Sequence, residues 1–151
     1  MSKIIIGIDP DSKAHGVAVY ESGVLVKLQS MSLMELYSLM LSLSHSGPVI
    51  HIEDVNAVSA AFGARDKRRE GGISVKLKMA QDIGMCKQAQ IEVERACESL
   101  GVKVVRHKIS KQWKCAKNGK AMFQRITGWL GRSNEDTRSA AYFGWLGVTG
   151  K

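Results

Sequence analysis

The sequence predicts an α/β fold with a five-stranded mixed sheet and helices on both faces. Two patterns lead to this prediction: three predicted strands follow one another directly, and the later strands alternate with helices. The length of 151 residues suits one domain with a buried core. We therefore expect the sheet to be antiparallel where it starts and parallel where helices connect its strands.

The first half of the chain contains four strand patterns and one helix pattern. The predicted strands span residues 3–9, 15–20, 24–29 and 48–54. The first, KIIIGID, is an apolar run typical of a strand buried on both faces, and it ends in Asp9. The fourth, PVIHIED, brings a second acid, Glu53, to a strand end. Ser32 is a suitable N-cap for a helix over 33–44, which Gly47-Pro48 ends.

The second half begins with residues 55–72, which include ARDKRREGG and few large apolar side chains, so we expect a loop there. The predicted elements that follow are a helix over 73–100, a strand over 102–107, and helices over 110–116, 120–129 and 134–147. Gly101 stops the long helix. The last helix begins with the acids Glu135 and Asp136.

The composition is basic, with a net charge of +8 at pH 7 and a pI near 9.6, which favours a polyanionic partner such as nucleic acid. The three cysteines show no CxxC spacing, so we expect free thiols rather than disulfides or a zinc site. No apolar run approaches the roughly 20 residues of a membrane helix. We expect no signal peptide, no membrane association and a cytoplasmic location.

Acidic residues recur at the ends of the predicted elements. If the first and fourth strands are parallel neighbours, Asp9 and Glu53 lie side by side, and the start of the last helix adds Glu135 and Asp136. Such a cluster repels itself unless divalent cations bind, and oxygen ligands favour magnesium or manganese. Taken singly, each acid has a simpler role, as a turn former, a solvated strand end or a favourable charge at a helix N-terminus.

The chain resembles the RuvC-type Holliday junction resolvases of the ribonuclease H-like superfamily, particularly their phage-type members. The matching segments, in the family's order, are IIIGIDPDSKAHGVAVY, VIHIEDV, GMCKQAQIEVERACESLGVKVVRH and SNEDTRSAAYFGWLG. The resemblance implies a ribonuclease H-like fold and a single nuclease domain over 1–151. It also implies a homodimeric endodeoxyribonuclease in a bacterial or phage-infected cell, which cleaves branched DNA with two Mg²⁺ ions, Mn²⁺ being a substitute, and no small-molecule cofactor.

The same resemblance assigns the catalytic and metal-binding acids. It implies that Asp9 and Glu53 are the first two. The family carries two acids three residues apart on the last helix; Asp136 aligns with the first of them, but Ser139 stands at the second. Glu135, beside Asp136, is the alternative fourth acid, although neighbouring helical residues point about 100° apart.

Basic and aromatic residues after the second acid are candidates for contacts with branched DNA. The predicted DNA-binding set is Phe62, Arg65, Lys67, Arg68, Arg69, Lys76, Lys78, Lys108, Lys111 and Arg132. Phe62 is placed to insert between bases or to make a local core contact. A wider basic set after the fifth strand includes Lys114, and Arg138 is expected to touch the scissile strand or to balance charge.

Three alternatives stay open at this point. The chain could act on RNA or on another DNA structure within the same superfamily. It could bind junctions without cutting, because the last acid pair is altered. The first motif also resembles that of actin-like and sugar-kinase ATPases, but those need two such domains around a nucleotide.

Overall fold

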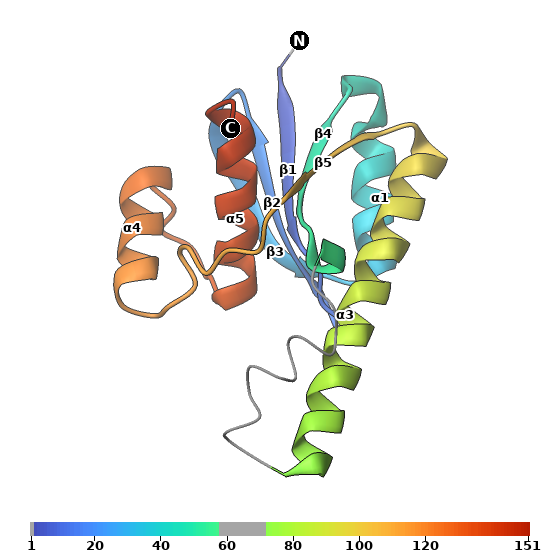
Figure 1. The fold of residues 1–151 in the computed structure, drawn as a ribbon. Helices are drawn as coiled ribbons and strands as arrows, with labels where there is room; N and C mark the ends of the chain where they lie inside the picture. The colour runs from blue at the N-terminus through green and yellow to red at the C-terminus, as the bar shows by residue number, and fades with distance from the viewer. Residues whose placement is uncertain (1, 58–71) are drawn as a thin grey trace.

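A mixed sheet of five strands organises the fold (Figure 1). The computed structural model describes residues 2–57 and 72–151. The strands are β1 (Ile4–Asp9), β2 (His15–Glu21), β3 (Val24–Met31), β4 (Val49–Glu53) and β5 (Lys103–His107). Their order is β3-β2-β1-β4-β5, with the first three antiparallel and β1-β4-β5 parallel. The predicted fold class is confirmed.

The register of the central strands follows from the sequence. Every residue of β1 is buried, as expected for a strand covered on both faces. Ser22 and Gly23 have φ angles of 50° and 85°, so β2 and β3 meet in a two-residue turn of the type that matches strand twist. In the parallel pair, Ile8 lies opposite Ile52. The residues that follow them, the two predicted acids, therefore reach the same edge of the sheet.

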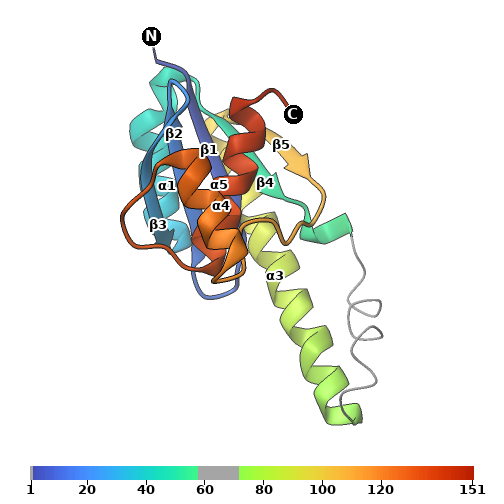
Figure 2. The same cartoon turned by 90° about the vertical axis from the view of Figure 1, so that its left-hand side faces the viewer.

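Helices cover both faces of the sheet (Figures 1 and 2). They are α1 (Leu33–Leu43), α3 (Ile73–Leu100), α4 (Asn118–Thr127) and α5 (Glu135–Val148), with short 3₁₀ turns at Ser44–Ser46 and Val55–Ala57. On one face of the sheet, side chains such as Ile6 and Ile50 pack with α1 and α3. On the other face, side chains such as Ile5 and Ala18 pack with α5 and α4. Figure 2 shows the first half of α3 extending past the sheet. Among the described residues, no helix combines the length and hydropathy needed to cross a bilayer.

Two strand glycines let α5 lie directly on the sheet. A Cβ on Gly7 would come within 2.0 Å of the Ala140 carbonyl oxygen, and one on Gly16 within 2.2 Å of the Asp136 carbonyl oxygen. Gly16 is the register partner of Asp9. The absence of a side chain there brings the first turn of α5 down to the strand end that carries Asp9.

The region between β5 and α5 differs from its prediction. The helix expected over 110–116 is wrong, because these residues form turns instead. Trp113 is the reason: its φ is 66°, a left-handed value that an α-helix does not contain, and its ring is buried. The following helix runs from Asn118 to Thr127 instead of over 120–129, and Gly128, at φ 71°, ends it.

The cysteines agree with the expectation from the sequence. Cys86, Cys97 and Cys115 are all free. Cys97 is fully buried and packs in the core between α3 and α1, next to Met40. The expectation of free thiols rather than disulfides is therefore confirmed.

Candidate active site

Two buried carboxyl groups lie on neighbouring parallel strands. Asp9 ends β1 and is 4% exposed, while Glu53 ends β4 and is 5% exposed. Among the described residues, Asp9 Oδ2 and Glu53 Oε2 have no hydrogen-bond donor. Buried polar atoms nearly always have a hydrogen-bond partner, whereas Glu53 Oε2 has none and Asp9 Oδ2 has only the Lys114 ammonium group at 3.5 Å, so this sheet edge has the character of a site built for another partner.

The electrostatics of this pair are unfavourable for two free anions. Burial raises the pKa of Asp9 to about 6, with Asp136 adding to the rise and Lys114 and Ser139 opposing it. Burial also raises the pKa of Glu53 to about 7, and the charges of Asp9 and Asp136 raise it further against Lys114. The charged forms therefore lack sufficient compensation from the protein, which a bound cation would supply.

Helix α5 brings a third carboxyl group and a hydroxyl group to the pair. The Asn134 side chain caps the helix by accepting from the Thr137 N–H at 2.8 Å, so the first turn is firmly placed. Asp136 is half-buried, and its charge acts on both strand acids. Ser139, one turn later, is fully buried, and its hydroxyl lies near enough to Asp9 to lower the pKa of that carboxyl group, although no hydrogen bond of normal geometry joins the two among the described residues.

Glu135 is placed differently from the other predicted acids. It is exposed, and its charge raises the pKa of Asp136 but is not among the causes that shift Asp9 or Glu53. The structure thus places Asp9 and Glu53 on neighbouring strand ends with Asp136 near enough for its charge to act on both, and it leaves Glu135 on the outer side of the helix start.

A lysine for which no special role was predicted lies near these acids. Lys114 Nζ is 3.5 Å from Asp9 Oδ2, and the lysine side chain is 26% exposed. Burial alone would lower the pKa of Lys114, but the charges of Asp9, Glu53 and Asp136 outweigh it and raise the pKa. Nothing in the local sequence singles it out from the other lysines after β5, because its position depends on the turn that carries it.

The donor chemistry of this cluster fits a divalent cation. Carboxylate and hydroxyl oxygens are ligands that Mg²⁺ and Mn²⁺ prefer, and two of the carboxylate oxygens are buried without a donor. As placed, residues 2–57 and 72–151 contain no three His, Cys, Asp or Glu side chains close enough to surround one ion. An ion at this edge would therefore need Asp136 to turn toward the strand acids, or would complete its shell with solvent or substrate oxygens.

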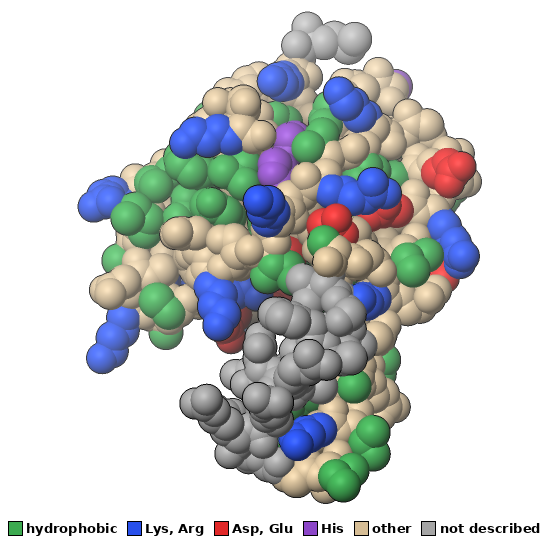
Figure 3. All heavy atoms as spheres, viewed as in Figure 1, with side chains coloured by type: hydrophobic (Ala, Val, Ile, Leu, Met, Phe, Trp, Pro, Cys, Tyr) green, Lys and Arg blue, Asp and Glu red, His purple; other side chains and the backbone are tan. Residues whose placement is uncertain are grey.

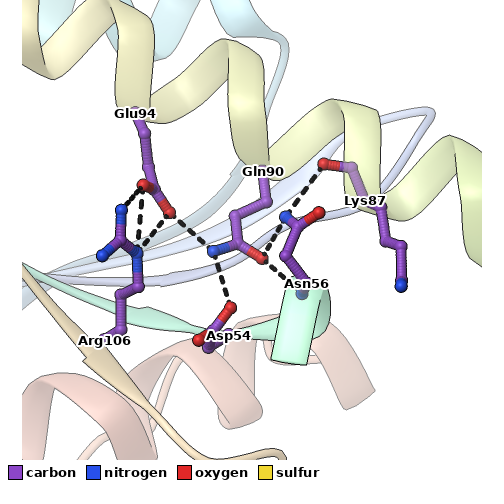
Figure 4. Close-up of polar contacts among 6 residues, drawn as sticks. All are labelled: Asp54, Asn56, Lys87, Gln90, Glu94 and Arg106. Carbon is purple, nitrogen blue, oxygen red and sulfur yellow. Dashed lines mark hydrogen bonds and ion pairs between the residues drawn. The ribbon is translucent and has the colours of Figure 1, made fainter. Parts of the chain in front are cut away.

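A polar network fixes the chain just beyond Glu53 to α3 (Figure 4). Gln90, 1% exposed, donates to Asp54 Oδ1 at 3.1 Å and to Glu94 Oε2 at 2.6 Å, and it accepts from the backbone and side-chain N–H groups of Asn56. Arg106 of β5 in turn donates to Glu94. Since every polar atom of Gln90 is used, the end of β4 is held firmly against the helix.

Two histidines occupy the same face of the sheet as Glu53. His51 Nδ1 and His107 Nε2 are 2.7 Å apart, and the two rings are stacked. Burial lowers the pKa of His51 to about 4, helped by His107 and nearby lysines, and burial lowers that of His107 as well. Both rings are therefore neutral near pH 7 and do not balance the charge of the acids.

The predicted DNA-binding residues fall into two groups. Phe62, Arg65, Lys67, Arg68 and Arg69 lie outside the described residues. Lys78, Lys108, Lys111 and Arg132 are exposed, and Lys76 is partly so. Lys and Arg side chains are distributed widely over the face shown in Figure 3. Arg138, in contrast, is buried and bonds to backbone carbonyls, so the expected contact with a scissile strand does not match its position.

Comparisons with known proteins place the fold. No protein-family model matches the chain, and no curated protein matches it in sequence. A solved structure of Thermus thermophilus RuvC in complex with a Holliday junction substrate superposes with a TM-score of 0.59 over 98% of this chain and 94% of that one, at 16% identity. Another Thermus thermophilus RuvC structure superposes with a TM-score of 0.58 over 97% of this chain and 96% of that one, also at 16% identity. The chain has the RuvC fold.

Proposed function

We propose that this protein is a metal-dependent endonuclease that cleaves branched DNA, with four-way junctions as the preferred substrate. The observation that carries the proposal is the pair of buried carboxyl groups of Asp9 and Glu53 on neighbouring strand ends, for which Lys114 is the one nearby cation among the described residues and on which the charge of Asp136 acts. The fold of this chain is similar to that of a RuvC protein whose structure was solved with a Holliday junction substrate, which supports the proposal. The sequence resemblance drawn from IIIGIDPDSKAHGVAVY and VIHIEDV points to the same activity.

Each residue of the site has a task in this proposal. Asp9, Glu53 and Asp136 hold two Mg²⁺ ions, for which Mn²⁺ can substitute, and Ser139 offers a neutral oxygen where the family carries an acid. When bound, divalent ions would supply Lewis-acid chemistry for activating a water and stabilising the leaving oxygen at a phosphodiester. Lys114 offsets the acids before ions bind and can then contact a phosphate oxygen. No covalent intermediate with the protein is involved.

Binding of branched DNA is assigned to the basic surface. The net charge of +8 supplies a sequence-independent attraction to the phosphate backbone. Lys76 and Lys78 start α3, and Lys108 and Lys111 follow β5, so both segments can contact DNA arms that lead to the acids. Arg132 precedes α5 and adds a third contact.

A homodimer is part of the proposal, because a four-way junction must be cut at two symmetric positions. The first half of α3 extends beyond the sheet (Figure 2), and several of its apolar side chains are exposed. Those with large exposed fractions are Ile73 at 75%, Leu77 at 65% and Met85 at 47%. Such residues are normally covered, and a second copy of the same helix would cover them.

The test is a nicking assay on a synthetic four-way junction with mapped cut positions. Wild-type protein should cut only with Mg²⁺ or Mn²⁺, and Asp9→Asn should bind the junction but not cut it. Matched flaps and RNA–DNA hybrids measure structural preference, and a better-cut hybrid would move the proposal to an RNA-directed enzyme. Junction binding without any metal-dependent nicking would refute the nuclease and leave a binding protein.

A further inference from the structure

The turn that carries Lys114 has an unusual backbone. Trp113 has a φ of 66°, which a side chain of this size rarely adopts. Its ring is nevertheless locked in place, with centroids 5.4 Å from those of both Tyr142 and Trp145 on α5. Packing of the ring thus overrides the backbone preference and fixes where the next residue points.

A buried guanidinium group holds the same turn from α5. Arg138 is 5% exposed, and its Nε donates to the Trp113 carbonyl at 2.9 Å. One terminal nitrogen donates to the Lys114 carbonyl at 2.5 Å, and the other to Ser133 Oγ at 3.1 Å. Within the described part of the chain, Arg138 forms no ion pair, so its charge is balanced by two carbonyl dipoles of this loop and by the Ser133 hydroxyl just before α5.

The start of α4 closes the turn from the opposite side. A Cβ on Gly119 would come 2.7 Å from the Trp113 carbonyl carbon and 3.0 Å from the Lys114 nitrogen. The Trp113–Lys114 peptide therefore has no room to shift toward α4, while Arg138 holds its carbonyls toward α5. With both sides occupied, the lysine side chain leaves the turn in one direction, and Nζ ends 3.5 Å from Asp9 Oδ2.

We propose that Arg138 is a positioning residue that holds the Trp113–Lys114 turn on α5 and so keeps the Lys114 ammonium group on the carboxylates of the site. Lys114 then occupies the space that a divalent ion would take beside Asp9, and it sets how tightly the acids bind one. An effect of Lys114 on DNA cleavage, through its effect on ion binding, rests on the proposed function. The position of Lys114 and its competition with a cation do not require any nuclease activity.

The test separates a positioning role from a purely structural one by a double-mutant cycle. Binding of Mn²⁺ alone is measured at pH 7.5 by electron paramagnetic resonance of the free ion. Lys114→Met should tighten binding about fivefold, because it removes a cation held beside the acids. Arg138→Lys keeps the charge but loses the planar fork, so it should produce part of that gain. In the Lys114→Met background, Arg138→Lys should change the affinity by less than about twofold.

Two further variants and a second readout protect the result from misfolding. Gly119→Ala pushes on the same peptide without touching α5 and should tighten Mn²⁺ binding like Arg138→Lys, whereas the exposed Arg125→Lys should have no effect. The ¹⁵N signal of the Lys114 ammonium group, assigned by its loss in Lys114→Met, should move toward the free-lysine position in Arg138→Lys and Gly119→Ala.

The outcomes are distinct. An unchanged ammonium signal in both folded variants overturns the positioning role, and so does an equal gain in Mn²⁺ affinity from Arg138→Lys with or without Lys114. If wild type and Lys114→Met both fail to bind Mn²⁺, the proposed function fails, while a shifted ammonium signal still supports the role of Arg138 in placing the lysine.

Discussion

Replacing Asp9 by Asn should stabilise the ion-free protein at alkaline pH. The carboxyl group is 4% exposed, one of its oxygens has no donor among the described residues, and burial raises its pKa from 3.8 to about 6. The folded protein therefore holds this proton up to about pH 6, while the unfolded chain releases it near pH 4. Between these values the folded state binds more protons, so the stability that this group contributes falls as the pH rises.

The size of the effect follows from the pKa shift. A rise in the pKa of Asp9 from 3.8 to about 6 corresponds to a loss of about 3 kcal/mol in the free energy of unfolding, and this loss is complete above pH 6. This value already contains the ion pair with Lys114, which lowers the pKa of Asp9. Asn is neutral and nearly the same shape, so Asp9→Asn should be up to about 3 kcal/mol more stable than wild type at pH 8 and nearly equal to it at pH 4.

The assay is urea unfolding of both proteins with EDTA at several pH values from 4 to 8. The difference between the two proteins is the informative quantity, because the buried histidines also titrate. The lowered pKa of His51, about 4, makes wild-type stability rise with pH up to the ordinary histidine value, and this contribution cancels in the difference. Adding Mg²⁺ at pH 8 should then stabilise wild type but not Asp9→Asn.

Two results would refute this reasoning. If Asp9→Asn is less stable than wild type at pH 8 without metal, the carboxylate is well compensated and the site is not poised for a cation. A difference that stays constant from pH 4 to pH 8 would show that Asp9 titrates normally. Either result would remove the physical argument for metal binding, independently of any cleavage assay.

Three further predictions concern the site and its support. Asp136→Asn should reduce Mg²⁺-dependent nicking by at least about 100-fold, whereas Glu135→Gln, on an exposed side chain, should stay within about threefold. Gln90→Leu should cost about 2 kcal/mol in urea unfolding, because it removes the hydrogen bonds that this buried amide makes to the partly buried Asp54 and Glu94. Gly7→Ala should cost about 3 kcal/mol or more, since its Cβ meets the backbone of α5 at 2.0 Å; Gly84→Ala, with open space around it, should stabilise the helix by about 0.5–1 kcal/mol.

The sheet and its two strand acids were predictable because their signals are local. An apolar run that ends in Asp9, and a second that ends in Glu53, identify strands whose carboxyl ends carry the acids. That β1 and β4 are parallel neighbours was a condition of the prediction, and the register of the sheet meets it. The i, i+3 spacing also placed Ser139 one turn from Asp136, where the structure has it.

The turn between β5 and α4 was not predictable in the same way. Its conformation depends on the Trp113 ring, which is held by aromatic residues of α5 some thirty positions later, and on hydrogen bonds from Arg138. The apolar and polar pattern over 110–116 resembles a helix, and packing overrides it. Lys114 is therefore one lysine among several in the sequence and a partner of Asp9 only in the folded chain.

The charges of the assembled site explain why this lysine matters. With every group ionised, the carboxylates of Asp9, Glu53 and Asp136 and the ammonium of Lys114 leave two negative charges among the described residues. One divalent ion balances that total, but a second ion would leave the buried site positively charged. A scissile phosphate would supply the missing negative charge and give Lys114 another partner. Under the proposed function, the same four side chains would therefore favour two bound ions only when a nucleic-acid backbone is present.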